Sequence, residues 1–275
     1  MNSFCRAVAA AALTVASVPF AIQPASAGVG DLLVAPTRLV LNGGRSAEVI
    51  LNNIGDEPAT YRISAEFRRM RPDGTLEEVA EPSDSEKAAR DMLIFAPRRV
   101  TLAPREPQSV RIAARPAKGL PDGEYRVHLL FRAIPPSTPV TQAASAPANG
   151  LSFKLVPVYG VTIPVIVRLG NLQATAGIAG VRLEKQGDEE AVGLDLTRTG
   201  SRSTFGEVRV LKAGVKEPIA LQRGVAIYTE VGKRHVSVPI QPDFRGKAAG
   251  PVTVEYLETT DDGSHLIAST QTVLR

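Results

Sequence analysis

The three histidines are the first side chains to test for chemistry. His128, His235 and His265 stand far apart, and none lies in an HExxH arrangement or four residues from another, the spacing that places two zinc ligands on one helix face. Asp261 to His265 contains the letters of a hydrolytic triad, but adjacent residues of a turn point in different directions and cannot form a relay. The sequence also lacks GxSxG, a phosphate-binding glycine loop and EF-hand spacing. We therefore expect no catalytic residue, no metal site, no cofactor and no enzymatic activity.

Composition places the chain among globular proteins. Its 275 residues are 44% hydrophobic and 22% charged, and 32 Lys and Arg stand against 28 Asp and Glu, which excludes a disordered tail. The basic excess is spread along the chain, so nucleic acid is not expected as a partner. Acidic runs such as Asp188-Glu189-Glu190 indicate a solvated loop, with calcium binding as the alternative.

The first 27 residues have the pattern of a secretory signal peptide. Arg6 precedes an almost uncharged stretch from 7 to 22, and Ala25-Ser26-Ala27 is a small-x-small cleavage site. The alternative is a membrane anchor, but the apolar run is shorter than the roughly 20 residues that span a bilayer. Cleavage after Ala27 removes the single cysteine, Cys5, so the exported chain has no thiol for redox chemistry or zinc binding. No later segment reaches a membrane-spanning length, so we expect no integral membrane segment after cleavage.

Strand signals dominate the rest of the chain. Short apolar or alternating runs are separated by Gly and Pro turns, which favours an all-β fold with two β-sandwich domains. The turn at 42–44 predicts a hairpin between 31–41 and 46–51, and only 84–90 is expected to be helical. Residues 135–150 form a low-complexity loop, and a second β pattern follows 170. We therefore expect two sandwiches that meet near residue 170.

One strand is unusually long and apolar. From 151 to 169 only Lys154 and Arg168 are charged, and the odd positions of its first half place apolar side chains on one face. Nineteen residues at about 3.3 Å each would span roughly 60 Å, too long for one small sandwich. The strand is either an interior strand that serves both domains or a partly exposed edge strand available to pair with another chain. Pro157 and Pro164 favour the edge.

Several stretches resemble the periplasmic chaperones of chaperone-usher pilus and fimbria assembly, in a divergent, non-enteric branch. The similar segments occur in the family's order through the mature chain, strongly from 33 to 169 and loosely beyond. They are Ala35 to Gly43 with Arg38, Ile94 to Ile112, Leu120 to Pro136 with its Ile-Pro-Pro ending, and Thr162 to Arg168.

The resemblance implies a fold and a function. It implies two immunoglobulin-like domains set at an angle, in a periplasmic, non-enzymatic chaperone that stabilises pilin-like subunits by donor-strand complementation and delivers them to an outer-membrane usher. The domains would be a signal peptide at 1–27, a chaperone domain at 28–169 and a second sandwich at 170–275. The alternatives are an exported immunoglobulin-like structural or adhesive protein and a secreted hydrolase or carbohydrate-binding protein. The free protein could also self-associate through the same apolar edge.

The resemblance also assigns site residues. Arg38 would bind the C-terminal carboxylate of the subunit, and Pro164 stands where many members have a second, lysine anchor. An interdomain ion pair would join Glu124 and Arg168, with Asp243 as a third member; the alternative is that these are ordinary surface charges. The donor side chains would be Leu151, Phe153, Leu155, Pro157 and Tyr159.

Overall fold

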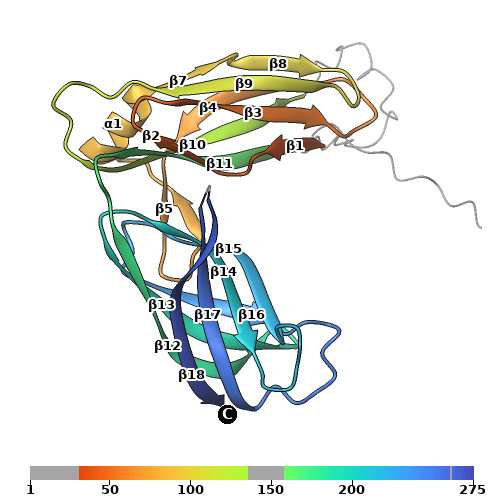
Figure 1. Cartoon of the computed structure of the whole chain (residues 1–275). Helices are drawn as coiled ribbons and strands as arrows, with labels where there is room; N and C mark the ends of the chain where they lie inside the picture. Colours follow the sequence, from red (N-terminus) through yellow and green to blue (C-terminus); the bar gives the residue numbers. More distant parts are fainter. Residues whose placement is uncertain (1–30, 136–157, 261) are drawn as a thin grey trace, which may run out of the picture.

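The computed structural model describes residues 31–135, 158–260 and 262–275. The predicted signal peptide and the donor residues 151, 153, 155 and 157 lie outside these ranges. Within them, no helix is long and apolar enough to cross a membrane. The chain forms two β-sandwiches that meet at an angle (Figure 1).

The first sandwich is made of two facing sheets. One has the strand order β1-β3-β9-β7 and the other the order β2-β11-β10-β4-β8. The strands are β1 (Leu32–Ala35), β2 (Leu39–Asn42), β3 (Ser46–Asn53), β4 (Ala59–Glu66), β7 (Leu93–Ala96), β8 (Arg99–Leu102), β9 (Pro107–Ala114), β10 (Gly123–Ile134) and β11 (Gly160–Leu169).

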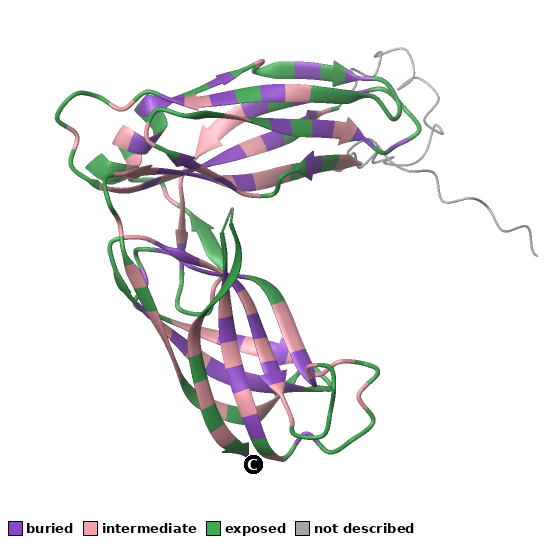
Figure 2. Ribbon diagram, in the orientation of Figure 1, coloured by how far each residue is buried: buried purple, intermediate pink, exposed green. Residues whose placement is uncertain are grey.

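Alternating side chains build the first core. On β3, Val49 and Leu51 are fully buried while Glu48 and Ile50 are exposed, and β9 repeats the pattern with Val110. The alternation is visible as colour banding along the strands in Figure 2. Because strand side chains alternate between faces, each core position adds one apolar side chain worth about 1.5–3 kcal/mol on burial.

The start of the first domain differs from the predicted hairpin. The turn at Gly43 forms, with a positive φ of 67°, but β2 does not pair with β3. Instead β1 pairs antiparallel with β3, and β2 crosses to the other sheet, where it pairs in parallel with β11. The predicted pairing is thus confirmed for β1 and wrong for β2, because turn residues fix the local chain reversal and do not determine which sheet the adjoining strand joins.

The one helix of the described residues lies where the sequence predicts it. Helix α1 (Asp84–Met92) begins with a capping box, in which the Ser83 hydroxyl accepts from the Glu86 N–H and the Glu86 carboxylate accepts from the Ser83 N–H. Ala89 and Met92 are buried against the first sandwich.

The second sandwich also has two sheets, with orders β12-β13-β16 and β15-β14-β17-β18. The all-β fold class with two sandwiches is therefore confirmed. The strands are β12 (Ala174–Gln186), β13 (Glu189–Gly200), β14 (Thr204–Leu211), β15 (Ala220–Ile227), β16 (Lys233–Pro239), β17 (Gly250–Thr260) and β18 (Gly263–Leu274).

A hairpin of the first domain reaches into the second. Strands β5 (Arg68–Met70) and β6 (Leu76–Glu78) pair only with each other, and Met70 is buried in the core of the second domain. The backbone N–H of Met70 donates to Glu230 Oε1 at 2.7 Å, and that of His235 donates to the carbonyl of Pro72 at 2.8 Å. The two domains are thus joined by this hairpin as well as by the chain after β11.

Candidate functional site in the interdomain cleft

Arg38 lies in a cleft between the two domains. It immediately precedes β2, whose crossing to the second sheet carries the residue toward the other domain. The cleft has a volume of about 340 Å³. Its walls are Arg38, Val40, Asn42 and Arg168 from the first domain and Phe205, Glu258, Thr259, Thr260 and Asp262 from the second.

The Arg38 guanidinium is a cation without a carboxylate partner among the described residues. Its Nη2 donates to the Ser203 hydroxyl at 3.5 Å, and its Cζ lies 4.7 Å from the centroid of the Phe205 ring. Its Nε is buried and has no hydrogen-bond partner in the described part of the chain. Burial lowers the pKa of Arg38 by removing water, and the positive charge of Arg168 acts in the same direction. The negative charge of an anion bound in the cleft would stabilise the charged guanidinium and so offset both effects.

Two of the other charges at the cleft, Glu258 and Arg168, are already paired, whereas Asp262 has no ion pair among the described residues. Both carboxylate oxygens of Glu258 accept hydrogen bonds from the Arg202 guanidinium. Arg168 Nε donates to Glu124 Oε2 at 3.0 Å. Of the described arginines that line the cleft, Arg38 is therefore the one with no carboxylate on its guanidinium.

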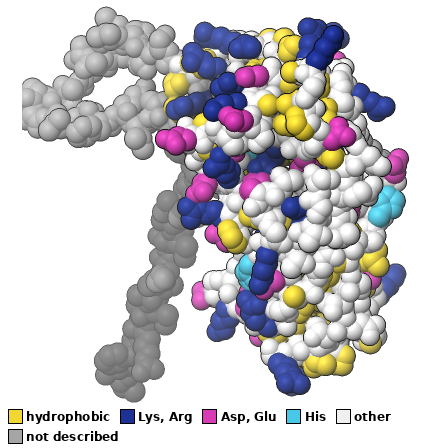
Figure 3. All heavy atoms as spheres, turned by 90° about the vertical axis from the view of Figure 1, so that its left-hand side faces the viewer, with side chains coloured by type: hydrophobic (Ala, Val, Ile, Leu, Met, Phe, Trp, Pro, Cys, Tyr) yellow, Lys and Arg dark blue, Asp and Glu magenta, His cyan; other side chains and the backbone are white. Residues whose placement is uncertain are grey.

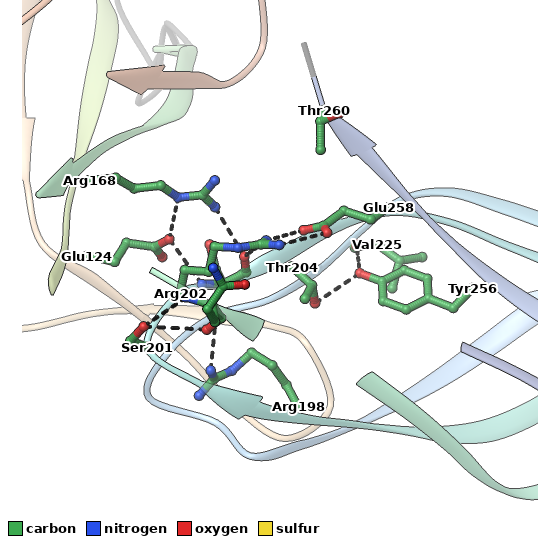
Figure 4. A network of polar contacts seen from close by, with 12 residues as sticks. Glu124, Arg168, Arg198, Ser201, Arg202, Thr204, Val225, Tyr256, Glu258 and Thr260 are labelled. Carbon is green, nitrogen blue, oxygen red and sulfur yellow. Dashed lines mark hydrogen bonds and ion pairs between the residues drawn. The ribbon is translucent and has the colours of Figure 1, made fainter. Parts of the chain in front are cut away.

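Glu124 and Arg168 lie directly opposite each other on β10 and β11 and point toward each other (Figure 4). Both bind Ser203 of the second domain. Glu124 Oε2 accepts from the Ser203 N–H at 3.0 Å, and Arg168 Nη2 donates to the Ser203 carbonyl at 3.1 Å. The side chain of Glu124 is only 1% exposed. The pair thus belongs to one domain and holds the backbone of the other.

Asp243 does not join this pair, which corrects the prediction. It is exposed in the loop between β16 and β17. That loop enters β17 at Gly250, whereas the cleft is lined by the opposite end of β17, at Glu258 to Thr260. The resemblance to the family is loose in the second domain, where differences in loop length make it uncertain which residue corresponds to a given family position. This is why Asp243 was chosen incorrectly.

Sequence reasoning missed the residues that shape the second-domain side. The Arg198 guanidinium donates to the carbonyls of Gly200, Arg202 and Thr229 at 2.8, 3.0 and 3.2 Å. These bonds fix the turn that leads to Ser203 and presents it to the first domain. Arg198 and Arg202 are seen in Figure 4. No spacing pattern identifies such a residue, since its partners are backbone carbonyls and any sequence provides them.

A second polar contact joins the domains away from the cleft. Arg126 Nη2 and Nη1 donate to the Glu230 carboxylate at 2.5 and 3.1 Å, and its Cζ lies 3.7 Å from the Tyr228 ring centroid. The imidazole of His128 is buried beside Tyr228, with ring centroids 6.4 Å apart, and neither ring nitrogen has a partner among the described residues. Burial lowers the pKa of His128 to about 3, with smaller contributions from Arg126 and Arg68.

Strand β11 combines the two alternatives left open by the sequence. From Val165 to Arg168 it is an interior strand between β10 and β2, whereas from Gly160 to Pro164 it pairs with β10 alone. Pro164 lies opposite His128 at the last residue before β2 begins to pair. Tyr159, the one donor candidate within the described ranges, is 55% exposed, and its carbonyl accepts from the Ala133 N–H at 2.9 Å.

The remaining histidines take structural positions. His235 lies between Asp195 and Glu184, at 3.3 and 3.2 Å, and His265 is exposed near the start of β18. No group of three or more His, Cys, Asp or Glu side chains that could hold a metal occurs in the described residues.

Comparison with known proteins gives structural likeness alone. No protein-family model matches the chain, and no curated protein matches it. Similar solved structures include the E. coli chaperone DraB, at 16% identity, covering 90% of this chain and 98% of that one with a TM-score of 0.45. The Pseudomonas aeruginosa CupB2 chaperone is 13% identical, with 88% and 100% covered and a TM-score of 0.46.

A complex is also among the similar structures. It is the CsuC-CsuE chaperone–tip adhesion subunit pre-assembly complex from the archaic chaperone-usher Csu pili of Acinetobacter baumannii, at 12% identity, 88% and 97% coverage and a TM-score of 0.44. The predicted likeness to pilus chaperones is thus found among solved structures as well. Identities of 12–16% and TM-scores of 0.44–0.46 do not assign a function. The function therefore has to be inferred from the residues of this chain.

Proposed function

We propose that this chain is a periplasmic chaperone that binds pilin-like subunits, stabilises them by donor-strand complementation and delivers them to an outer-membrane usher. The observation that carries the proposal is the half-buried guanidinium of Arg38, which faces the cleft without a carboxylate partner in the described part of the chain. A chain-terminal carboxylate is a suitable occupant because arginine binds carboxylates with two parallel charge-assisted hydrogen bonds.

The cleft also offers replacements for the missing second anchor. Pro164 has no side-chain donor, so the carboxylate needs another partner beside Arg38. The Asn42 amide and the Thr259 hydroxyl line the same cleft, and each can donate a hydrogen bond, whereas the Thr260 hydroxyl already donates to the Gly263 carbonyl at 3.1 Å. We assign the second contact to Asn42 and Thr259.

The open half of β11 supports strand donation. The odd-numbered residues of β11, Ile163 in the open half and Val165 directly after it, point into the first core. Extended backbone with the same parity would place further apolar side chains beyond the end of the sandwich, where a subunit lacking a strand could bury them. Each buried side chain of this size contributes about 1.5–3 kcal/mol. The proposed donors are Leu151, Phe153, Leu155, Pro157 and Tyr159.

The test is co-purification from periplasm with the exported proteins encoded beside this chain. We expect the wild type to retain a small β-rich partner and Arg38→Ala to lose at least ten times as much of it as Arg111→Ala. Arg111 is an exposed arginine on the outer face of β9, paired with Glu48 at 3.1 Å, and serves as the matched control. The urea midpoint of Arg38→Ala should not fall, because the substitution removes a buried charge that has no carboxylate partner.

Two results would contradict the proposal. Equal partner recovery with Arg38→Ala and Arg111→Ala would refute the assignment of Arg38 as the carboxylate anchor. A wild type that purifies without any partner would favour the structural or adhesive alternative. Extending the partner by a few C-terminal residues should also abolish capture, because the terminal carboxylate would no longer lie in the cleft.

A further inference from the structure

Three arginines lie side by side on the outer face of the first domain. Arg62 on β4 is directly opposite Arg99 on β8 and directly opposite Arg132 on β10. All three are exposed. Because neighbouring strands are about 4.8 Å apart, these residues form a row roughly 10 Å long across three strands. We call them the arginine row.

No carboxylate of the described residues pairs with the arginine row. Glu66, on the same face of β4, is engaged by Arg68 at 2.5 Å and by the Thr162 hydroxyl at 3.0 Å. The segments 1–30 and 136–157, which the structure does not describe, contain no Asp or Glu. Some other exposed arginines are paired, including Arg71 with Glu77 and Arg223 with Glu207, and others, such as Arg45 and Arg105, are single charges without an ion pair in the described residues. On the face in Figure 3 basic and acidic side chains are interspersed.

The row is unfavourable in the isolated chain. Like charges directly opposite each other in a sheet destabilise the pairing, and here the middle residue has such a neighbour on both sides. An anion bound across the row would be attracted to all three guanidinium groups, and this attraction would offset the repulsion between neighbouring arginines. The surrounding side chains on this face include Thr60 and Thr101, which hydrogen-bond each other at 2.9 Å, and the half-buried Leu130 and Ile134.

The size and setting of the row identify the class of partner. A nucleic acid or anionic membrane is bound by a broad basic patch, whereas three arginines among threonine and half-buried aliphatic side chains are typical of a protein interface. Carboxylates three or four residues apart on a helix are about 5–6 Å apart, which matches the strand spacing.

We propose that the arginine row is a docking surface for an acidic protein segment that presents carboxylates in line at about 5 Å intervals. Each guanidinium can bind one carboxylate. The row ends at Arg132, which lies opposite Gly160 at the open half of β11, so a segment docked here would lie beside a strand edge. The surface is distinct from the cleft and does not depend on the Arg38 anchor.

The first experiment measures binding of a synthetic 16-residue helical peptide with glutamates at i and i+4 spacing, by fluorescence anisotropy at low salt. We expect the triple variant Arg62→Gln, Arg99→Gln, Arg132→Gln to weaken binding at least tenfold. The charge-matched control is Arg71→Gln, Arg111→Gln, Arg223→Gln, and each residue in it already has a carboxylate partner. Equal loss in both triple variants, or no binding to the wild type, would overturn the proposal.

The second experiment separates docking from a structural role. Arg62→Glu places a carboxylate between two arginines, so we expect the melting temperature to rise by about 2 °C while peptide binding falls at least tenfold. A fall in melting temperature with unchanged binding would refute the docking role. Tighter binding of heparin or of phosphatidylglycerol vesicles than of the peptide, lost with the same triple variant, would show that the partner is not a protein.

Discussion

At the scale of single residues, the half-buried Arg38 and the buried His128 differ in how they meet the free-energy cost of removing a charge from water. Arg38 stays charged and faces a cleft, whereas His128 is buried beside Tyr228 with no partner on either ring nitrogen in the described residues. Taking charge out of water is costly unless it is compensated. Arg38 can be compensated by a ligand, and His128 avoids the cost by staying neutral.

His128 predicts an acid-sensitive interface between the domains. Its pKa is about 3 in the folded protein, below the ordinary value of 6.5, so between these pH values the unfolded chain binds a proton that the folded chain excludes. The contribution of His128 to the free energy of unfolding is therefore fully present above pH 6.5. It falls as the pH drops, by up to about 1.4 kcal/mol per pH unit. Urea unfolding at pH 7, 6 and 5 should show this slope.

Replacing the His128 imidazole tests whether this residue causes the predicted pH dependence of stability. His128→Phe should remove this contribution from the slope, while His265→Gln, at an exposed position, should leave it unchanged. The window above pH 5 avoids Glu86, whose pKa is lowered to about 2 chiefly by its hydrogen bonds from Arg69. An unchanged slope in His128→Phe would show that another group controls acid stability.

Glu124 and Arg168 were expected as an ion pair from the resemblance to the chaperone family. The structure places them opposite each other on β10 and β11, with Arg168 Nε 3.0 Å from Glu124 Oε2. Asp243 was misplaced because no register constrains a loop. Arg198 was missed because its partners are backbone carbonyls, and Ser203 was missed because it binds Glu124 and Arg168 through its own backbone atoms. Backbone atoms carry no sequence signal.

At the scale of elements, the β5–β6 hairpin is the feature that the sequence did not reveal. The run Arg68-Arg69-Met70-Arg71 is expected to form a surface hairpin, and the hairpin does form. However, one apolar residue in such a short basic run gives no periodicity that could show its partner is the second domain. Met70 is 6% exposed and Leu76, opposite it, is 36% exposed.

The difference between these two residues predicts unequal substitution effects. Met70→Ala should destabilise the protein by about 2–3 kcal/mol, because it leaves a cavity in the second core. Leu76→Ala, on the same hairpin, should cost less than about 0.5 kcal/mol. Hydrogen exchange at the Met70 and His235 amides, which bond across the domains, should accelerate only in Met70→Ala. Equal effects of the two substitutions would show that the hairpin does not dock.

At the scale of the whole molecule, several polar contacts join the domains. Glu124 and Arg168 hold Ser203 at the cleft, and Arg126, two residues from Glu124 on β10, holds Glu230. Together with the hydrogen bonds of the β5–β6 hairpin, these contacts resist rotation better than a single hinge does, so the walls of the cleft should keep a fixed separation before any ligand binds. The sequence could predict two sandwiches from strand patterns, but their angle depends on side-chain contacts that no pattern encodes.

Glu230→Gln should loosen this arrangement. Arg126 would lose its ionic partner while its side chain is only 9% exposed, which favours domain positions that hydrate it. Spin labels at Gln108→Cys and Lys247→Cys, with Cys5→Ser, should give a broader interdomain distance distribution by double electron–electron resonance. Glu217→Gln, at an exposed position, is the control. A distribution equal to that of the control would show that the cleft-side contact alone sets the angle.

The parallel pairing of β2 with β11 has a consequence for the order of events during folding. Leu39 pairs with Val165, so the strand that follows Arg38 has no partner until more than a hundred further residues have been synthesised. Contacts between such distant parts of a chain close late because of their entropy cost. Arg38 therefore reaches its place only when the first sandwich is complete and Ser203 has arrived. The cleft is thus among the last parts of the molecule to assemble, and a partly folded chain has no binding site there.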